Sequence, residues 1–437
     1  MTDYNEIKSV AQEQYAKMPD EANLLYIRNH VLMQVQQELT RDGGAEDETR
    51  HFRSAYDSLS KELELIESRR FDAVIGSADK VISAAGHIGV IPVEELPDAI
   101  IKSKLHDNYE DKFVAMIHAY SKYAVVIDVP DNAKMNINLL FINTDAPLIT
   151  QVLTRVGNNS KLGLTEIFQS KTTGSSVLGA MNEVSVADSS SVEVNMLHNE
   201  DKDTKVLNFC KGRAGSSSKL NVNFVYNGGS LTRSKNSVKA IGSQSQVDVR
   251  ELIFGEGDQK FDVNTVIEND GIETNSILES KAAVKGRSIA WLKGFAKIDY
   301  GSVGAKSFVS ERGLIVDRGA KIESLPSMAI DESEVRATHS SATAPIDEDS
   351  LFYIGSRGIT EAMARRLMLT GFFADTLYKV NDRLIKVIAL ALIREKISGR
   401  GFGHVPRIDN DDIVFAGFAG KEEEAQLGQH YKYRTQK

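Results

Sequence analysis

The sequence predicts a mainly β protein in which a parallel β-helix is flanked by helical segments. Between residues 113 and 345, apolar and polar residues alternate in short stretches, as on strands with one buried face, and these stretches recur at a nearly constant interval. On either side, apolar residues recur every three or four positions, which is typical of amphipathic helices. We therefore expect an N-terminal helical domain over residues 1–112, a β-helix over 113–345, a C-terminal helical domain over 346–400 and a flexible tail over 401–437.

The repeat is clearest in four segments, each of which begins with small polar residues and continues as an alternating strand. Their first inward-facing apolar residues are Leu162, Val192, Leu220 and Val247, which are 30, 28 and 27 residues apart. A coil of this length cannot bury its own apolar face and must stack on the next coil, as in a solenoid. Valine and leucine at every second position fit a parallel β-helix, with a β-sandwich as the alternative fold. Further strands are expected at residues 261–267, 298–303, 307–316, 321–328 and 334–339.

The N-terminal segment predicts helices over residues 24–39 and 51–70, because apolar residues recur there at helical spacing. The histidines of this region show no metal-ligand spacing, so we interpret them as surface or packing residues. These histidines are His30, His51, His87 and His106.

The C-terminal segment predicts two further helices. In the first, Met363 and Leu367 share a face with Arg366. An unpaired charge is costly to bury, so this face suits a partner interface better than a sealed core. The second helix, over residues 377–391, carries its apolar residues on one side and is expected to pack within the same domain.

The composition excludes several classes of function. A formal net charge of −9 argues against nucleic acid as a partner, because phosphate binding needs clustered lysine and arginine. The most apolar stretch, residues 384–397, contains four charged residues and falls short of the roughly 20 apolar residues of a membrane span. The first residues do not resemble a signal peptide. We therefore expect a cytoplasmic protein without membrane contact.

No catalytic constellation stands out in the sequence. Segments 212–219 and 255–258 contain glycine but lack the pattern of a phosphate-binding loop, and we interpret both as turns. The single cysteine, Cys210, excludes an internal disulfide and lies in a strand pattern. We interpret it as an inert buried thiol.

The segment 334–373 is the most informative part of the chain. It places His339 among small hydroxyl residues, followed by an acidic turn, an apolar block and the sequence Ser356-Arg357-Gly358-Ile359. We expect Ser356 to Gly358 to open a helix. This order resembles the signature of the SufB/SufD family of iron–sulfur cluster assembly proteins, which implies a right-handed parallel β-helix. The positions in register with that signature are Val335, His339, Thr343, Ile346, Asp347, Leu351, Phe352, Tyr353, Ser356, Arg357, Gly358, Ile359, Gly371 and Phe372.

Within this family, the resemblance favours a SufD-like member. SufB-like members carry a cysteine on a late strand, and Ser310 is the residue nearest to that position here, so the cluster-ligand position is lost. A SufB-type glutamate beside the histidine is replaced by Ser340, and a cysteine two residues before it by Ala337. His339 matches a histidine that is implicated in cluster assembly in SufD-like members. It is the candidate iron or cluster site, because imidazole can bind iron through a free nitrogen.

The resemblance implies a non-catalytic subunit that docks a SufC-like ABC-type ATPase through its C-terminal helices. It also implies pairing through the β-helix, with a SufB-like paralogue or with a second copy of the chain. No cofactor would be firmly bound, and iron or an iron–sulfur cluster would pass transiently through the subunit interface. The alternatives are a homodimeric scaffold that acts alone and a β-helix enzyme that acts on carbohydrate. The residues expected to bind the ATPase are Tyr353, Ser356, Arg357, Gly358, Ile359, Met363, Arg366, Leu367 and Phe372.

Overall fold

The computed structural model describes residues 112–401 without interruption. It also describes residues 9, 11–13, 71–77, 80–84, 88–93, 96, 403–408, 411–413 and 416. The two predicted N-terminal helices, the four N-terminal histidines and the tail beyond residue 416 lie outside the described residues.

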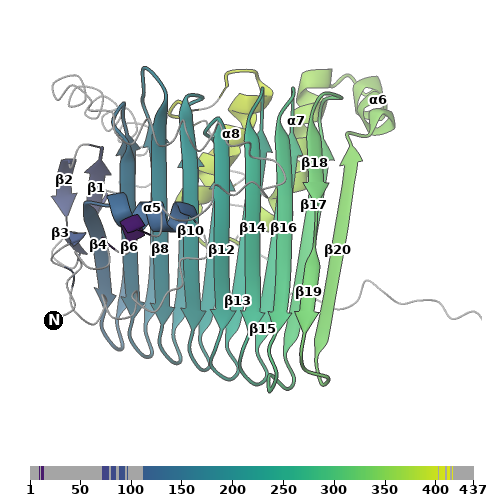
Figure 1. Ribbon diagram of the computed structural model, residues 1–437. Coiled ribbons are helices and arrows are strands. Elements are labelled where there is room, and N and C mark those ends of the chain that lie inside the picture. The colour runs from purple at the N-terminus through teal and green to yellow at the C-terminus, as the bar shows by residue number, and fades with distance from the viewer. Residues whose placement is uncertain are drawn as a thin grey trace, which may run out of the picture.

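Two sheets of ten strands face each other and enclose the main core (Figure 1). From β4 to β18 the chain alternates between the sheets, so that hydrogen-bonded neighbours are two strands apart in sequence and run parallel. This confirms the predicted parallel β-helix. Sheet A has the order β2 (Lys80–Ala84), β1 (Ala73–Gly76), β5 (Lys134–Asn143), β7 (Lys161–Ser170), β9 (Ser191–Asn199), β11 (Lys219–Tyr226), β13 (Gln246–Gly255), β15 (Asn275–Val284), β17 (Lys306–Ile315) and β20 (Arg336–Pro345). Sheet B has the order β18 (Lys321–Ser324), β16 (Ile289–Ile298), β14 (Lys260–Asn269), β12 (Leu231–Ala240), β10 (Thr204–Ala214), β8 (Ser176–Val186), β6 (Leu148–Val156), β4 (Tyr123–Val129) and β3 (Ile88–Pro92), and β19 (Ser327–Ile330) also pairs with β16.

The predicted repeat corresponds to one row of stacked side chains in sheet A. Val192 pairs with Leu162 on one side and with Leu220 on the other, and Leu220 pairs in turn with Val247. All four side chains are buried in the main core. The row therefore stacks apolar residues from successive coils, which is how a solenoid buries surface that no single coil could bury alone.

One turn of each coil contains a residue with a positive φ angle, and these turns stack on one another. These residues precede the strands of sheet A, and each donates its backbone N–H to the equivalent turn of the next coil. Asparagine tolerates the left-handed conformation, and glycine adopts it without strain. The residues are Asn132, Asn159, Ser189, Ser217, Gln244, Glu273 and Gly304.

The parts outside the solenoid are only in part helical. The segments 73–76, 80–84 and 88–92 fall in the range expected to be helical, but they are the strands β1, β2 and β3, which extend the two sheets. α5 (Lys112–Tyr120) packs its apolar residues on the outer face of sheet B, where the ring of Phe113 lies 4.9 Å from the guanidinium carbon of Arg233. After the solenoid come α6 (Glu348–Ser356), α7 (Glu361–Leu377) and α8 (Arg383–Ile397).

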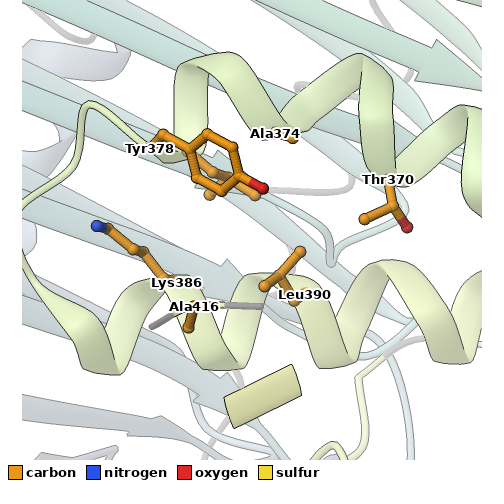
Figure 2. Close-up of a pocket in the computed structure, with 7 residues that line it drawn as sticks. Thr370, Ala374, Tyr378, Lys386, Leu390 and Ala416 are labelled. Carbon is orange, nitrogen blue, oxygen red and sulfur yellow. The ribbon is translucent and has the colours of Figure 1, made fainter. Parts of the chain in front are cut away.

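α8 packs on α7 as expected, but the two helices also pack together on the solenoid. α7 and α8 lie against the outer face of sheet A, as the two yellow-green helices behind the sheets in Figure 1. Leu384 and Ile388 of α8 join Leu197 and Leu252 of sheet A in one apolar cluster. Figure 2 shows residues of α7 and α8 facing each other across a cavity of only about 10 Å³, which leaves room for one water molecule at most.

The described part of the C-terminal segment packs onto the same layer. Ile408 and Ala416 belong to the apolar cluster between α8 and sheet A, and buried Asp412 forms a 2.9 Å ion pair with Arg394. None of the helices in the described residues is both long enough and apolar enough to cross a membrane.

Candidate interaction sites at the end of the solenoid

The last coil leaves one strand with an open edge. Among the described strands, β20 pairs only with β17, and nearly all of its residues are exposed. Arg336 and Ile346 donate their backbone N–H groups to Ala305 and Ile315, so the even-numbered residues of β20 bond to the neighbouring strand. The odd-numbered residues therefore direct their N–H groups away from the sheet. Such an edge is a template for pairing with another chain.

His339 lies on the inner side of this last strand. It is opposite Val309 in the register of β20 and β17, and Val309 is fully buried in the core. Two residues further on, Ser341 donates a 2.8 Å hydrogen bond to Ser324 of sheet B, which places the odd-numbered side chains of β20 toward the interior. His339 is therefore an exposed residue at the mouth of the solenoid, meaning the open end of its interior between β20 and β18.

Ser310 lies on the other face of sheet A. It is opposite Ser340, and the two hydroxyl oxygens are 3.3 Å apart. Because side chains alternate along a strand, Ser310 and Ser340 point outward whereas His339 points to the mouth. These positions therefore cannot ligate one metal ion together within a single chain.

Metal-ligating side chains do not gather into a site in the part of the chain that the structure describes. The described residues contain no group of three or more histidine, cysteine, aspartate or glutamate side chains that could hold a metal ion. Cys210 is buried, and its burial together with the nearby carboxyl of Glu166 raises the pKa of the thiol. This agrees with the predicted inert thiol, because the thiolate is the form that binds metals.

Residues 356–360 form a corner between two helices. The prediction that Ser356 to Gly358 opens a helix was wrong, because α6 ends at Ser356 with Arg357 as its C-cap. Gly358 follows with a φ of 82°, a left-handed conformation that favours glycine after a helix. Thr360 then caps α7 by accepting a 3.4 Å hydrogen bond from the backbone N–H of Met363.

This corner presents an exposed apolar surface, which we call the α6–α7 face. Five large side chains make up the face, and each exposes more than a third of its surface, although residues of this size are normally buried. The guanidinium carbon of Arg357 lies 4.7 Å from the ring centroid of Tyr353, so these two side chains stack. The five residues of the face are Phe352 (79% exposed), Tyr353 (58%), Ile359 (36%), Met363 (43%) and Leu367 (45%).

Two of the residues expected to bind a partner are partly buried. Phe372 packs edge-on against Phe373 at 5.1 Å, and its ring lies 5.2 Å from the ammonium group of Lys281. Arg366 is half-buried, and its charge acts on Asp412. Both residues therefore hold α7 in place. The remaining expected residues, Ser356, Arg357 and Gly358, are exposed beside the α6–α7 face.

Polar contacts fix the α7–α8 hairpin to sheet A. The ammonium group of Lys396 is fully buried and donates to the carbonyl oxygens of Asn227 (2.5 Å) and Phe254 and to Oε1 of Gln259 (2.8 Å). Lys281 donates to the carbonyl oxygen of Phe372 at 2.6 Å. The α6–α7 face is thus carried by a hairpin that is bonded to the solenoid at several points.

Residues 140–372 match the model of the SufBD core domain of the SUF system for iron–sulfur cluster assembly. The match covers more than half of the chain and extends from β5 to α7, so it includes nearly the whole solenoid and the α6–α7 corner. This chain belongs to the SufBD core family.

SufBD proteins from several bacteria are similar to this chain. A SufBD family protein of Mycobacterium bovis is 29% identical over 204 residues, which are 45% of this chain and 49% of that protein. SufD of Bacillus subtilis is 24% identical over 294 residues, 66% of this chain and 67% of that protein. SufD of Escherichia coli is 23% identical over 172 residues, 39% of this chain and 41% of that protein. The chain spans about half the length of the mycobacterial relatives that it matches.

The residues that match the SufB/SufD signature form two surfaces near the end of the solenoid. Its first part, around His339, is the open strand β20, and its second part, around Arg357, is the α6–α7 corner. The helices do not cover the strand, because β20 remains exposed.

Three buried carboxyl groups in the interior of the SufBD solenoid were not predicted from the sequence. Glu166, Glu251 and Glu311 are each at most 2% exposed and lie on inward-facing positions of sheet A. The sequence does contain the signal, because Glu251 is an even number of residues from the inward-facing Val247 and Val249. Burial raises the pKa of Glu166 to about 8 and that of Glu311 to about 7, and it also raises the pKa of Glu251.

Proposed function

We propose that this chain is a non-catalytic, SufD-like subunit of an iron–sulfur cluster assembly complex. In this proposal the α6–α7 face docks an ABC-type ATPase of the SufC kind, and the open strand β20 pairs with a SufB-like paralogue. The observation that carries the proposal is the α6–α7 face itself, an apolar surface within the SufBD signature that the chain leaves exposed. Exposed apolar clusters of this kind mark protein–protein interfaces.

The anchoring of the hairpin explains how such a partner could act on the solenoid. Lys281 and Lys396 bond α7 and α8 to strands of sheet A, so a force on the hairpin reaches β13 and β15 directly. Nucleotide-driven movement of the ATPase would thereby open or close the partner interface at β20. Iron and sulfur would be delivered there as substrates, with His339 as the residue of this chain that can bind iron and with further ligands from the partner chain.

Binding to a purified SufC-like ATPase tests this proposal. The variant Met363→Asp with Leu367→Asp puts two charges on the α6–α7 face and should weaken complex formation at least about 30-fold. Tyr300→Asp is the matched control, because Tyr300 is 88% exposed on a distant turn of the solenoid. If the double variant bound as well as the control, this face would not be the docking site.

The open edge of β20 also supports a second candidate, a homodimer that acts as a scaffold without a paralogue. Pairing through backbone groups does not require a partner with a different sequence. Anaerobic reconstitution of the purified chain with iron and sulfide separates the two candidates. A lone scaffold would hold a coloured cluster, whereas an accessory subunit would not.

A further inference from the structure

The three buried glutamates lie in one row of stacked side chains in the interior of the solenoid. The row runs along sheet A from β7 to β20 and faces sheet B. Apolar residues separate the first glutamate from the others, whereas only a serine lies between the second and the third. In order, the row consists of Glu166, Met196, Phe224, Glu251, Ser280, Glu311 and Ser341.

The carboxyl group of Glu251 is bound by neutral donors. Ser280 donates a 2.6 Å hydrogen bond to Oε2, Asn236 donates a 3.3 Å bond to Oε1, and Thr265 also donates to Oε1. None of these contacts supplies a positive charge, so burial dominates and raises the pKa of this carboxyl group above its ordinary value. The groups that face Glu251 from the elements around it are Tyr226 of β11, Asn236 of β12, Thr265 of β14, Ser280 of β15 and Glu311 of β17.

Glu311 is connected to the mouth by two hydroxyl groups. Its Oε1 accepts a 2.5 Å hydrogen bond from the backbone N–H of Gly294, and its Oε2 accepts one from Ser324. Ser324 in turn accepts a 2.8 Å hydrogen bond from Ser341, which is exposed on β20. A fully buried carboxyl group is therefore two hydroxyl groups away from the mouth.

Ser280 lies between the two carboxyl groups in the row. Neighbouring strands are about 4.8 Å apart, so Ser280 is one strand from Glu251 on one side and from Glu311 on the other. The charge of one carboxylate raises the pKa of the other. This effect adds to burial, which is the larger cause of the raised pKa of Glu311.

We propose that Glu311, Ser324 and Ser341 form an internal proton relay that opens at the mouth of the solenoid. Carboxyl and hydroxyl groups can each donate one hydrogen bond while accepting another, which proton transfer along a chain requires. Both hydroxyls donate toward the interior, so the chain is arranged to carry a proton inward to the carboxylate of Glu311.

The inward transfer is balanced in protons. Ser324 gives its hydroxyl proton to Glu311, Ser341 replaces that proton, and a protic group at the mouth replaces the proton of Ser341. The carboxylate becomes a carboxylic acid, and the group at the mouth becomes an anion. No electrons are transferred and no covalent bond between heavy atoms changes.

The chemistry of the donor follows from the proposed function, on which this part of the inference rests. Thiols and hydrosulfide lose their proton when they bind iron, so cluster assembly releases protons where it occurs. We assign the relay to a protic sulfur ligand of this class. Ser341 is two residues from His339 along β20 and shares its inward side, so the entry of the relay lies near the candidate iron residue.

Infrared spectroscopy of the isolated full-length chain tests the relay without any partner. The carbonyl stretch of a protonated carboxylic acid is separate from the carboxylate bands and shifts when the acid proton exchanges with deuterium. At neutral pH we expect such a band in the wild type, with lower intensity in Glu311→Gln. Absence of the band would overturn the proposal.

The exchange rate after transfer into D₂O tests the path. Ser341→Ala and Ser324→Ala should slow the deuterium shift by about tenfold, which corresponds to about 1.4 kcal/mol in the barrier. Ser340→Ala is the matched control, because this serine is on the same exposed strand but faces outward. Equal rates in the Ser341 and Ser340 variants would mean that the proton leaves by local opening, and would contradict the relay. The docking proposal would be unaffected by that result, because its test uses different residues.

Discussion

His339 lies directly opposite Val309 in the register of β20 and β17, so an inner row of the solenoid ends in an exposed imidazole. Val309 is fully buried by the coil on its other side, whereas His339 has no further coil to cover it among the described residues. The two residues occupy equivalent places in successive coils, and only the end of the solenoid makes them different. In this SufBD chain, the candidate iron residue therefore lies on the last strand, where a partner chain paired with β20 would cover it.

The free edge of β20 gives a prediction about pairing. Thr343 is odd-numbered, so its N–H points away from β17, and Thr343→Pro should remove an edge donor without disturbing the neighbouring strand. We expect this variant to lose pairing with a SufB-like partner, or with itself, in sedimentation experiments. Ala342→Pro is the comparison, because its N–H faces β17 and its loss should lower the thermal unfolding midpoint. Unchanged pairing in Thr343→Pro would show that β20 is not the contact.

Lys396→Met tests the anchoring of α8. The buried ammonium group binds three oxygen atoms of sheet A and its following turns, and the substitution leaves these acceptors without a donor. We expect a loss of about 2–4 kcal/mol in the free energy of unfolding, measured by urea denaturation. Lys379→Met removes a more exposed ion pair with Glu279 and should cost less than about 1 kcal/mol. Equal effects of the two substitutions would contradict the anchoring role.

At the corner between α6 and α7, we expect alanine substitutions at two glycines to have opposite effects on stability. Gly358 has a φ of 82°, so Gly358→Ala should destabilise the chain by about 1 kcal/mol, although no atom lies within 4 Å of the added methyl group. Gly355 is helical and equally uncrowded, so Gly355→Ala should be neutral or stabilise the chain by up to about 1 kcal/mol. Thermal unfolding measures both effects. The same sign at both positions would disagree with the observed corner.

The pH dependence of stability follows from the raised pKa values in the interior. Glu166 has a pKa of about 8 and Glu311 of about 7 in the folded chain, against 4.5 for an unperturbed glutamate. At a pH between 4.5 and the raised pKa of each group, the folded state binds more protons than the unfolded state. The free energy of unfolding therefore falls as pH rises through this range. The slope is at most about 1.4 kcal/mol per pH unit for each group, and the loss is complete above pH 8. Glu166→Gln should flatten the dependence between pH 5 and about 8 in urea denaturation, and an unchanged slope would show that this carboxyl is ionised when folded.

The architecture could be predicted because a solenoid repeats the same requirement in every coil. Inward positions such as Leu162 and Val192 must be apolar at a fixed interval, and this leaves a periodic pattern in the sequence.

The prediction of a strand at residues 298–303 was wrong, because a turn can carry the same alternating pattern. Ile298, Tyr300 and Val303 mimic a strand pattern, but residues 299–303 form the turn after β16. The strand predicted over residues 321–328 is divided into β18 and β19, which Pro326 separates.

The placement of the helices could not be predicted, because helical periodicity shows that one face is apolar but does not show what covers it. Leu384 and Ile388 carry the same pattern whether they pack on α7 alone or on sheet A as well. Phe372 matched the family signature, yet the signature does not distinguish a residue that binds a partner from one that packs against Lys281. The buried glutamates were missed because a single polar residue at an inward position resembles a break in the pattern.

Quantitative binding to a SufC-like ATPase tests the central claim most directly, with the wild type, Met363→Asp plus Leu367→Asp, and Tyr300→Asp measured side by side. The three proteins should unfold at similar temperatures, because all of these side chains are exposed. We predict that the wild type and the Tyr300 variant bind with equal affinity. Charges at the centre of an apolar contact cost about 2 kcal/mol or more, so the double variant should bind at least about 30-fold more weakly. Equal affinity of all three proteins, or no binding by the wild type, would contradict the claim that the α6–α7 face docks the ATPase.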